Sequence, residues 1–223
     1  TKEKTAWALG LAGVQSSGLT ISAYAGAMSK KLHAGNASKA GVISALLAKN
    51  GFTGPTEILE GKGGFLRTFS DGQYPRKVLD GMGLQFKIMR VGLKPYACCG
   101  LLHAPIDAVS HAMKKSRGLR PDQIRQIRIT TNKHAAEDYG KIHDPKSTYE
   151  AQISMPYAVA SAVARSSASV RDFSTEEVRN EKVLDLAKKV RVLADPRMDK
   201  IFPRRIYAIA EIESKDRRVY RSL

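Results

Sequence analysis

The hydrophobic pattern of this chain changes once, near residue 84, and that change limits the possible fold more than any other feature. Up to residue 83 the apolar residues recur at helical spacing, and every predicted element is a helix. From residue 84 onward, segments with a period of two alternate with helical segments. The sequence therefore predicts an α+β protein, with part of an all-helical domain over residues 1–83 and a smaller α+β domain over residues 84–223.

Small residues dominate the first helical stretch. Residues 5–28 are rich in Ala, Gly and Ser, and each glycine costs a helix roughly 1 kcal/mol relative to alanine. A stretch with this many small residues is typical of helices that pack very closely. We therefore expect one or two buried helices here. Residues 37–49 form a further predicted helix, and its apolar stripe consists of Val42, Ile43, Leu46 and Leu47.

The second part of the chain alternates strands with helices. Residues 123–132 place Ile127 and Ile129 on one face and Arg128 on the other, as in a half-buried strand. The remaining predicted strands cover residues 84–96, 205–214 and 217–223, and the last two are expected to pair. The predicted helices cover residues 104–115, 151–165 and 174–190. We expect an antiparallel or mixed sheet.

The charge of the chain favours an anionic partner. Lys and Arg number 37 against 21 Asp and Glu, which gives a net charge of +16. A basic nucleic-acid-binding module is one alternative, and it predicts binding that weakens steeply with salt. However, aromatic residues make up only 7% of the chain, which is few for stacking on single strands, and no nucleic-acid-binding motif is present. Nucleic acid is therefore the less favoured partner.

The two cysteines exclude several kinds of site. Cys98 and Cys99 are neighbours in sequence, a poor geometry for a disulfide, so we expect a reducing, cytoplasmic setting and small packing residues. No zinc-ligand spacing occurs, and two cysteines are too few for an ordinary iron–sulfur cluster. We therefore expect no metal. The sequence shows no run long enough to span a membrane and no signal peptide.

The segment "SKKLHAGNASKAG" is the first candidate site. Lys30 and His33 lie among small residues that leave the backbone open to a ligand. A solvated turn between helices is the simpler interpretation of spacing alone, and it is favoured about two to one. The alternative is a site that binds an anion.

Two further segments carry candidate residues. In "KPYACCGLLH", Lys94 precedes a proline and is held extended, and His103 stands at the start of a helix. A loop lysine and a capping histidine would explain this segment equally well. Tyr157 follows Pro156 in a small-residue helix, where a core tyrosine is the simpler interpretation. Residues and spacing alone thus indicate a basic, metal-free protein with an affinity for anions.

Three stretches together resemble the MmgE/PrpD family. These are "KKLHAGNASKAGVISALLAKNGFTGPTEILEGKGGF", "VGLKPYACCGLLHAPIDA" and "YEAQISMPYAVASAV", in the family's order and at about its spacing. The family includes 2-methylcitrate dehydratase, cis-aconitate decarboxylase and iminodisuccinate epimerase. The resemblance implies a helical domain and an α+β lid with the active site between them, a homodimer, and no metal or organic cofactor.

The resemblance also implies roles for the candidate residues. Lys30 and His33 fall in the family's Lys-x-Leu-His segment, Lys94 and His103 in its Lys-Pro-Tyr loop, and Tyr157 on its active-site tyrosine. The substrates are small di- or tricarboxylates, which lysines hold as point charges while a histidine moves a proton. We expect Lys30 and Lys94 to face a common cleft, and Tyr157 to keep its hydroxyl at the cleft edge.

The sequence gives the class of reaction better than the reaction. Proton abstraction beside a carboxylate suits dehydration, decarboxylation and epimerisation, and a 2-methylcitrate dehydratase-like lyase is the most generic choice. Family members begin well upstream, and those upstream helices supply an Asp and histidines to the site. The expectation is therefore a downstream half of the fold, whose N-terminal half is supplied separately, or else a truncated fragment without activity of its own.

Overall fold

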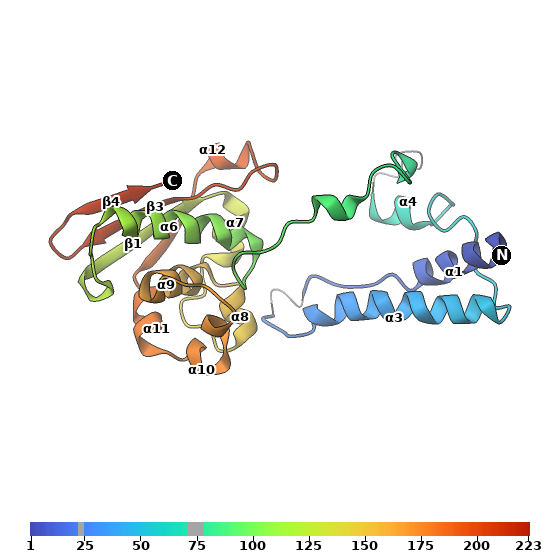
Figure 1. Ribbon diagram of the computed structural model, residues 1–223, viewed down its shortest axis with the longest axis horizontal. Helices are drawn as coiled ribbons and strands as arrows, with labels where there is room; N and C mark the ends of the chain where they lie inside the picture. Colours follow the sequence, from blue (N-terminus) through green and yellow to red (C-terminus); the bar gives the residue numbers. More distant parts are fainter. Residues whose placement is uncertain (22–24, 71–77) are drawn as a thin grey trace. The chain divides into compact units, whose positions relative to one another are not determined.

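The chain folds into two units, which are described separately. The computed structural model describes residues 1–21, 25–70 and 78–223. Residues Thr1–Gly92 form the helical unit, and residues Leu93–Leu223 form the α+β unit (Figure 1). The protein is thus an α+β protein, as the sequence predicts. The division between the units falls downstream of the boundary that the hydrophobic pattern places after residue 83.

The helical unit has no strand among its described residues. Its elements are α1 (Lys2–Val14), α3 (Lys30–Lys49), α4 (Phe65–Phe69) and the 3-10 turn η1 (Lys87–Arg90). The strand predicted from residue 84 is therefore wrong. Residues 87–93 are all exposed and pair with no strand, and η1 takes up part of the segment instead, because an isolated strand leaves its backbone groups unpaired.

Glycines let α1 approach the loop after α3. Gly10 is buried in α1, and a Cβ added to it would lie 2.2 Å from the carbonyl oxygen of Pro55. From the other side, a Cβ on Gly54 would lie 2.4 Å from the carbonyl oxygen of Trp7. The two backbones therefore touch at a distance that only glycine allows. The predicted close packing is found between α1 and this loop, but the expectation of buried helices is wrong, because only Gly10 and Leu11 of α1 are buried.

Replacing Gly10 with alanine is expected to lower the free energy of unfolding of the helical unit by about 1–3 kcal/mol, because the added methyl group must push Pro55 away. Gly35→Ala is the matched control. Gly35 lies within α3 with no atom within 4 Å of its would-be Cβ, so alanine there should stabilise the helix by about 1 kcal/mol. Urea unfolding followed by circular dichroism measures both. Equal effects of the two substitutions would contradict the packing argument.

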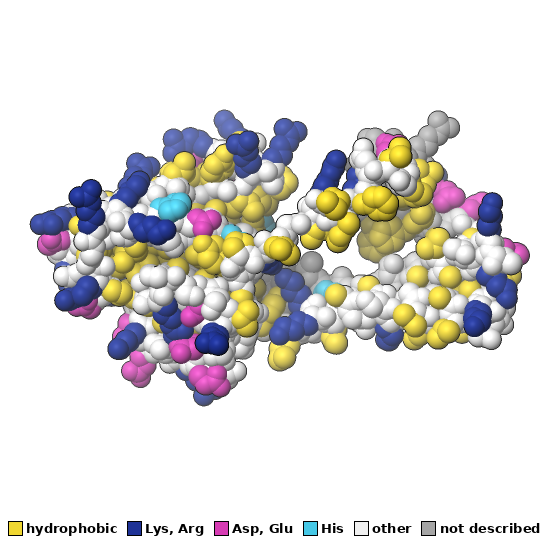
Figure 2. All heavy atoms as spheres, viewed as in Figure 1, with side chains coloured by type: hydrophobic (Ala, Val, Ile, Leu, Met, Phe, Trp, Pro, Cys, Tyr) yellow, Lys and Arg dark blue, Asp and Glu magenta, His cyan; other side chains and the backbone are white. Residues whose placement is uncertain are grey.

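Helix α3 turns its large apolar residues away from α1. The buried positions of α3 are the small residues Ala40, Ser44 and Ala48, and Ser44 accepts a hydrogen bond from Gln15 at 3.0 Å. The predicted stripe is exposed, and Val42 reaches 62% exposure. Figure 2 shows apolar side chains along the surface of this helix. We define the apolar face of α3 as Leu32, Val42, Ile43, Leu46 and Leu47.

A mixed four-stranded sheet organises the α+β unit. The strands are β1 (Ile124–Thr131), β2 (Val190–Ala194), β3 (Ile209–Ser214) and β4 (Val219–Ser222), in the spatial order β2-β1-β3-β4. β1 runs parallel to β2 and antiparallel to β3, and β4 pairs antiparallel with β3. The pairing of the last two predicted strands is confirmed. The predicted helix over 174–190 extended too far, because its last residue opens β2.

Two helices supply most of the core on one face of the sheet. α6 (His103–Lys115) packs on β3 and β4, and α9 (Met155–Arg165) packs on α6 and β2 (Figure 1). Ile127, Ile129 and Ile212 point toward these helices and are fully buried. The smaller elements are η2 (Gly100–Leu102), η3 (Pro121–Gln123), α7 (Lys133–Tyr139), α8 (Thr148–Gln152), η4 (Arg171–Phe173), α10 (Thr175–Val178), α11 (Glu181–Ala187) and α12 (Pro196–Asp199).

Candidate functional site

The loop that connects Lys94 to His103 is fastened to the core of the α+β unit. The backbone N–H of Ala97 donates to the carbonyl oxygen of Ala168 at 3.1 Å, and that of Cys99 donates to Gln152 at 2.8 Å. The Lys94 ammonium donates to the carbonyl oxygen of Cys98 at 3.2 Å, so its side chain folds back along the loop. Lys94 and His103 therefore belong to one fixed segment.

His103 is the first residue of helix α6, and one of its imidazole nitrogens makes no hydrogen bond within the described residues. Its ring meets the Tyr96 ring edge to face, with 5.3 Å between centroids and 90° between planes. The Nε2 atom is buried and has no hydrogen-bond partner among the described residues. Burial lowers the pKa of His103, and the Lys94 charge lowers it further, against a backbone hydrogen bond to Cys98 that raises it. The imidazole is therefore held neutral near pH 7, with one nitrogen free for a proton.

Tyr96 and Asp107 hold the imidazole in place, and reasoning from the sequence missed both. The Tyr96 hydroxyl donates to Asp107, which lies one helical turn after His103 on α6. Burial raises the pKa of Tyr96 to about 12, and the Asp107 carboxylate adds to that rise. The phenol therefore stays protonated and fixed. The i, i+4 spacing of His103 and Asp107 was the signal that could have revealed this pair.

The adjacent cysteines have different surroundings. Cys98 is buried, and burial raises the pKa of its thiol to about 12, as expected of a packing residue. Cys99 is partly exposed and lies beside Tyr139 at the end of α7, where burial raises the pKa of the Tyr139 hydroxyl to about 12. This contact brings α7 against the loop of Lys94 and His103.

Lys30 and His33 lie in the first turn of α3, where a turn between helices was the simpler expectation. Lys30 is exposed and His33 is partly buried, three residues apart and therefore on one side of the helix. Ser29 makes no side-chain cap, and the first turn has no acidic residue. The His33 ring packs over Gly18. Because Lys30 and Lys94 belong to different units, their convergence on one cleft stays a prediction.

The expected place of the Tyr157 hydroxyl at a cleft edge is wrong. Tyr157 is fully buried in the α+β unit, and its hydroxyl has two backbone acceptors, the carbonyl oxygens of Asp172 at 2.7 Å and Glu177 at 2.9 Å. Burial raises the pKa of Tyr157 to about 12. The small residues around it on α9 let the ring enter the core, and the tertiary fold supplies the acceptors. The structure thus gives Tyr157 the core position that local sequence favoured.

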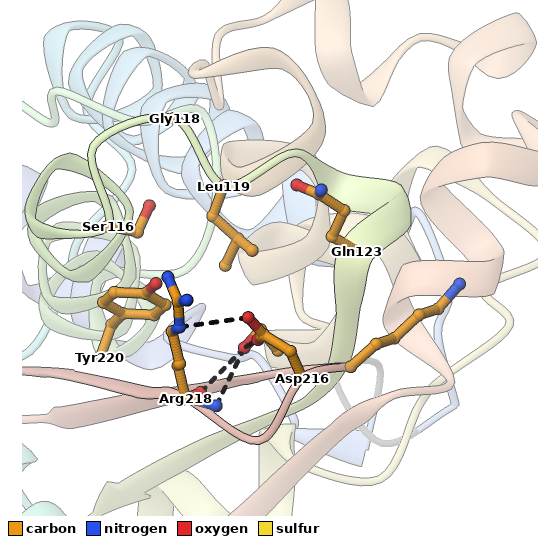
Figure 3. A pocket seen from close by; sticks show the side chains of 9 residues that line it. Ser116, Gly118, Leu119, Gln123, Asp216, Arg218 and Tyr220 are labelled. Carbon is orange, nitrogen blue, oxygen red and sulfur yellow. Dashed lines mark hydrogen bonds and ion pairs between the residues drawn. The ribbon is translucent and has the colours of Figure 1, made fainter.

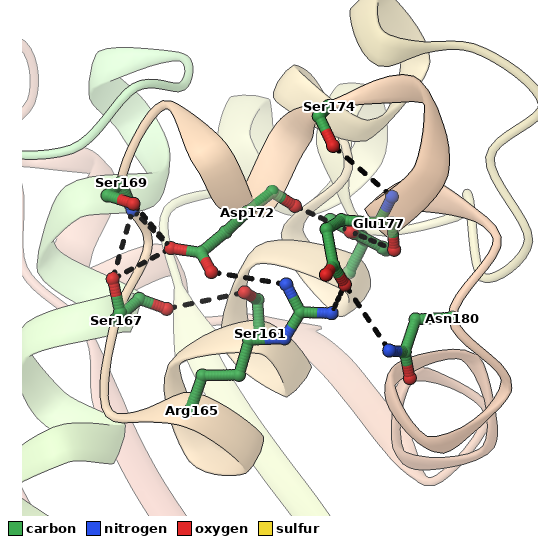
Figure 4. Close-up of polar contacts among 9 residues, drawn as sticks. Ser161, Arg165, Ser167, Ser169, Asp172, Ser174, Glu177 and Asn180 are labelled. Carbon is green, nitrogen blue, oxygen red and sulfur yellow. Dashed lines mark hydrogen bonds and ion pairs between the residues drawn. The ribbon is translucent and has the colours of Figure 1, made fainter.

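A polar network centred on the buried carboxylate of Asp172 surrounds those carbonyls (Figure 4). The Asp172 carboxylate accepts hydrogen bonds from the Ser167 hydroxyl at 2.7 Å and from the Ser169 backbone N–H at 2.7 Å. Arg165 pairs with Asp172 at 3.1 Å and also with Glu177. All of these groups have partners within the unit, so the network is structural.

The sequences of both units match one family. Residues 1–77 match the MmgE/PrpD N-terminal domain, and residues 96–223 match the MmgE/PrpD C-terminal domain. The chain belongs to the MmgE/PrpD family. The resemblance predicted from the three sequence stretches is thereby confirmed.

The relatives that this MmgE/PrpD chain matches are named as decarboxylases. The chain is 31% identical over 198 residues to the cis-aconitate decarboxylase of Aspergillus terreus, a match that covers 82% of this chain and 40% of that protein. It is 29% identical over 184 residues to the cis-aconitate decarboxylase of Mus musculus, covering 78% of this chain and 36% of the relative. The chain therefore spans about 40% of the length of the curated relatives it matches.

Two cavities of this MmgE/PrpD chain are lined by residues outside the Lys94–His103 loop. A pocket of about 320 Å³ lies beside the β3–β4 hairpin, where Asp216 and Arg218 pair at 3.2 Å (Figure 3). A groove of about 880 Å³ in the helical unit runs between the end of α1 and α3, and Phe65 and Phe69 line it. Neither cavity is lined by a predicted site residue.

Neither a candidate metal site nor a membrane-spanning helix occurs in residues 1–21, 25–70 and 78–223, which the structure describes. They contain no group of three or more His, Cys, Asp and Glu side chains placed to hold a metal ion. None of their helices is both long and apolar enough to cross a membrane. It remains a prediction that the protein works without a metal or cofactor.

Proposed function

We propose that this chain forms part of a cofactor-independent lyase that acts on a small di- or tricarboxylate. The observation that carries the proposal is the segment in which the Lys94 ammonium and the buried, unpartnered Nε2 atom of His103 are held together at the start of α6. Membership in the MmgE/PrpD family and the net charge of +16 support the same class of substrate. Lys30 and His33 are proposed as further substrate-binding residues.

Lys94 and His103 have different roles in the proposed reaction: Lys94 supplies a positive charge, and His103 transfers a proton. An ammonium group can bind a substrate carboxylate and stabilise the negative charge that grows when a proton leaves the adjacent carbon. A neutral imidazole with a free Nε2 can accept that proton. In a dehydration, the electron pair of the broken C–H bond forms the double bond, and the hydroxyl on the neighbouring carbon leaves with a proton as water.

The reaction within the family is the finer part of the proposal. The lowered pKa of His103 favours a base, and therefore a reaction that begins with proton abstraction, such as 2-methylcitrate dehydration. The names of the relatives favour decarboxylation of cis-aconitate, in which the C–C bond to a carboxylate breaks, carbon dioxide leaves and a proton is added to the remaining carbon chain. Turnover of 2-methylcitrate, citrate and cis-aconitate, measured by ultraviolet absorbance and carbon dioxide release, separates the two. No turnover and no binding of any of these acids would overturn the proposal.

The acid limb of the kcat/KM profile is expected below pH 6.5, the ordinary pKa of histidine, because burial and the Lys94 charge lower the pKa of His103. The sign follows from the role of a base. The neutral form works, so activity is present above the pKa and is lost as the pH falls through it. Lys94→Met should move this limb toward higher pH. Activity lost as the pH rises through the His103 pKa would instead identify a proton donor, as decarboxylation requires.

We propose that helices of the rest of a MmgE/PrpD helical domain cover the apolar face of α3, either from an N-terminal half supplied separately or within a homodimer. The exposed residues of this face and the partial coverage of the relatives support the proposal. Light scattering with and without a polypeptide that carries the relatives' upstream helices tests it. Slower amide exchange along α3 in the complex is the expected result, and unchanged exchange would contradict it.

A further inference from the structure

Tyr149 has a buried hydroxyl without a partner. The residue lies in the first turn of α8, and only 5% of its surface is exposed. Its hydroxyl is one of three buried side-chain polar atoms that have no hydrogen-bond partner in the described part of the chain. The others are Nε2 of His103 and Nδ2 of Asn132. Such groups are rare in native proteins and cost stability, so each calls for an explanation.

The surroundings connect Tyr149 to the candidate site. The backbone N–H of Cys99 donates to the carbonyl oxygen of Gln152, which is the last residue of α8. The Cys99 side chain lies close enough to Tyr149 and Tyr139 to contribute to the raised pKa of both hydroxyls. Cys99 itself belongs to the loop between Lys94 and His103. Two of the three unpartnered atoms, those of His103 and Tyr149, therefore belong to the loop or to the helix fastened to it.

The hydroxyl is available as a donor. Burial raises the pKa of Tyr149, with a smaller contribution from Cys99, so the phenol stays protonated at neutral pH. A protonated phenol needs an acceptor oxygen, and a carboxylate is a strong one. Tyr157 on the neighbouring helix α9 provides the contrast. Its hydroxyl is just as enclosed, but two backbone carbonyls satisfy it.

We propose that Tyr149 is a substrate-binding residue, whose hydroxyl donates a hydrogen bond to a carboxylate oxygen of the polycarboxylate held by Lys94. This inference rests on the proposed function and adds to it Tyr149, which is the first residue of the third family stretch but had no role assigned from the sequence. The unpartnered hydroxyl is then a feature of the ligand-free protein, because the substrate supplies the acceptor.

Tyr149→Phe tests the inference because stability and binding should change in different directions. Removing an unpartnered hydroxyl should leave the melting temperature unchanged or raise it. The same variant should weaken the calorimetric Kd for cis-aconitate and citrate by about 10-fold or more, the scale of a lost hydrogen bond to a charged group. Tyr157→Phe is the contrast for stability, because it leaves two carbonyls without their donor and should lower the melting temperature. Tyr220→Phe, in the pocket beside the β3–β4 hairpin, should leave binding unchanged.

The outcomes separate this inference from the proposed function. If the unaltered chain binds the acids and Tyr149→Phe binds them equally well, the inference is wrong and the function stands. A fall in melting temperature for Tyr149→Phe as large as that for Tyr157→Phe would show that the hydroxyl has a partner in the protein, which also overturns the inference. If the unaltered chain, combined with the polypeptide that carries the relatives' upstream helices, binds neither cis-aconitate nor citrate, the proposed function fails, and the ligand assigned to Tyr149 fails with it.

Discussion

Replacing His103 with glutamine is expected to lower kcat/KM for the polycarboxylate substrate by about 100-fold or more, the usual contribution of a positioned acid or base. Glutamine can still form a hydrogen bond, but it cannot take up a proton at neutral pH. The unpartnered Nε2 of the imidazole is the atom whose function is removed. Steady-state kinetics give the rate, and thermal unfolding of the same preparation shows that the fold is intact.

His111→Gln is the matched control for this prediction. His111 lies on the same helix, α6, but is exposed, so its replacement should leave kcat/KM within about twofold of the unaltered value. A variant at His103 that keeps its full rate would exclude a role in proton transfer. A loss of activity that follows a loss of stability would mean that the imidazole acts only in packing against Tyr96.

The second large effect is expected for Asp172→Ala, which should lower the free energy of unfolding of the α+β unit by about 3–5 kcal/mol. Asp172 is 7% exposed and binds Ser167, Ser169 and Arg165 (Figure 4). Removing the carboxylate takes the acceptor from the Ser167 and Ser169 donors and leaves Arg165 with Glu177 as its remaining partner. Urea unfolding measures the change.

Asp185→Ala controls for the loss of an acidic residue as such. Asp185 pairs with Lys188 at the surface, where both side chains are more than 60% exposed, so this change should cost less than about 1 kcal/mol. Burial acts to raise the pKa of Asp172, but the hydrogen bonds from Ser167 and Ser169 and the pairing with Arg165 outweigh it and lower the pKa. The stabilisation is therefore present above the ordinary value of 3.8 and is lost as the pH falls below it. Equal losses for both variants would contradict a special role for Asp172.

The elements of the α+β unit with a strong hydrophobic period could be predicted from the sequence. Ile127 and Ile129 alternate with Arg128, and α6 buries Ile106 and Val109 on one side, because those periods correspond to one buried face. The two elements that were predicted wrongly have only a weak hydrophobic period. Residues 84–96 contain apolar residues that find no partner strand, and the helix predicted over 174–190 breaks at Asn180, whose backbone is extended.

The candidate site could be predicted only in part. The sequence indicated Lys94 and His103, because the Lys-Pro-Tyr loop resembles that of a family. It did not indicate Tyr96, Asp107 or Tyr149, whose roles depend on contacts between elements. It also misplaced the hydroxyl of Tyr157, because no local pattern shows that the carbonyls of Asp172 and Glu177 come within hydrogen-bond distance.

By itself, the sequence determined the change from helical to α+β structure, the MmgE/PrpD resemblance and the types of residue available for binding an anion. Period, charge and residue order are properties of the chain alone, so they can be read without a fold. Only the tertiary structure decided which side chains are left without partners. The large residues of α3 are exposed because small ones contact α1, and the hydroxyls of Tyr149 and Tyr157 differ because only one meets backbone acceptors. Burial and hydrogen-bond pairing arise when distant segments pack together, and local sequence does not specify them.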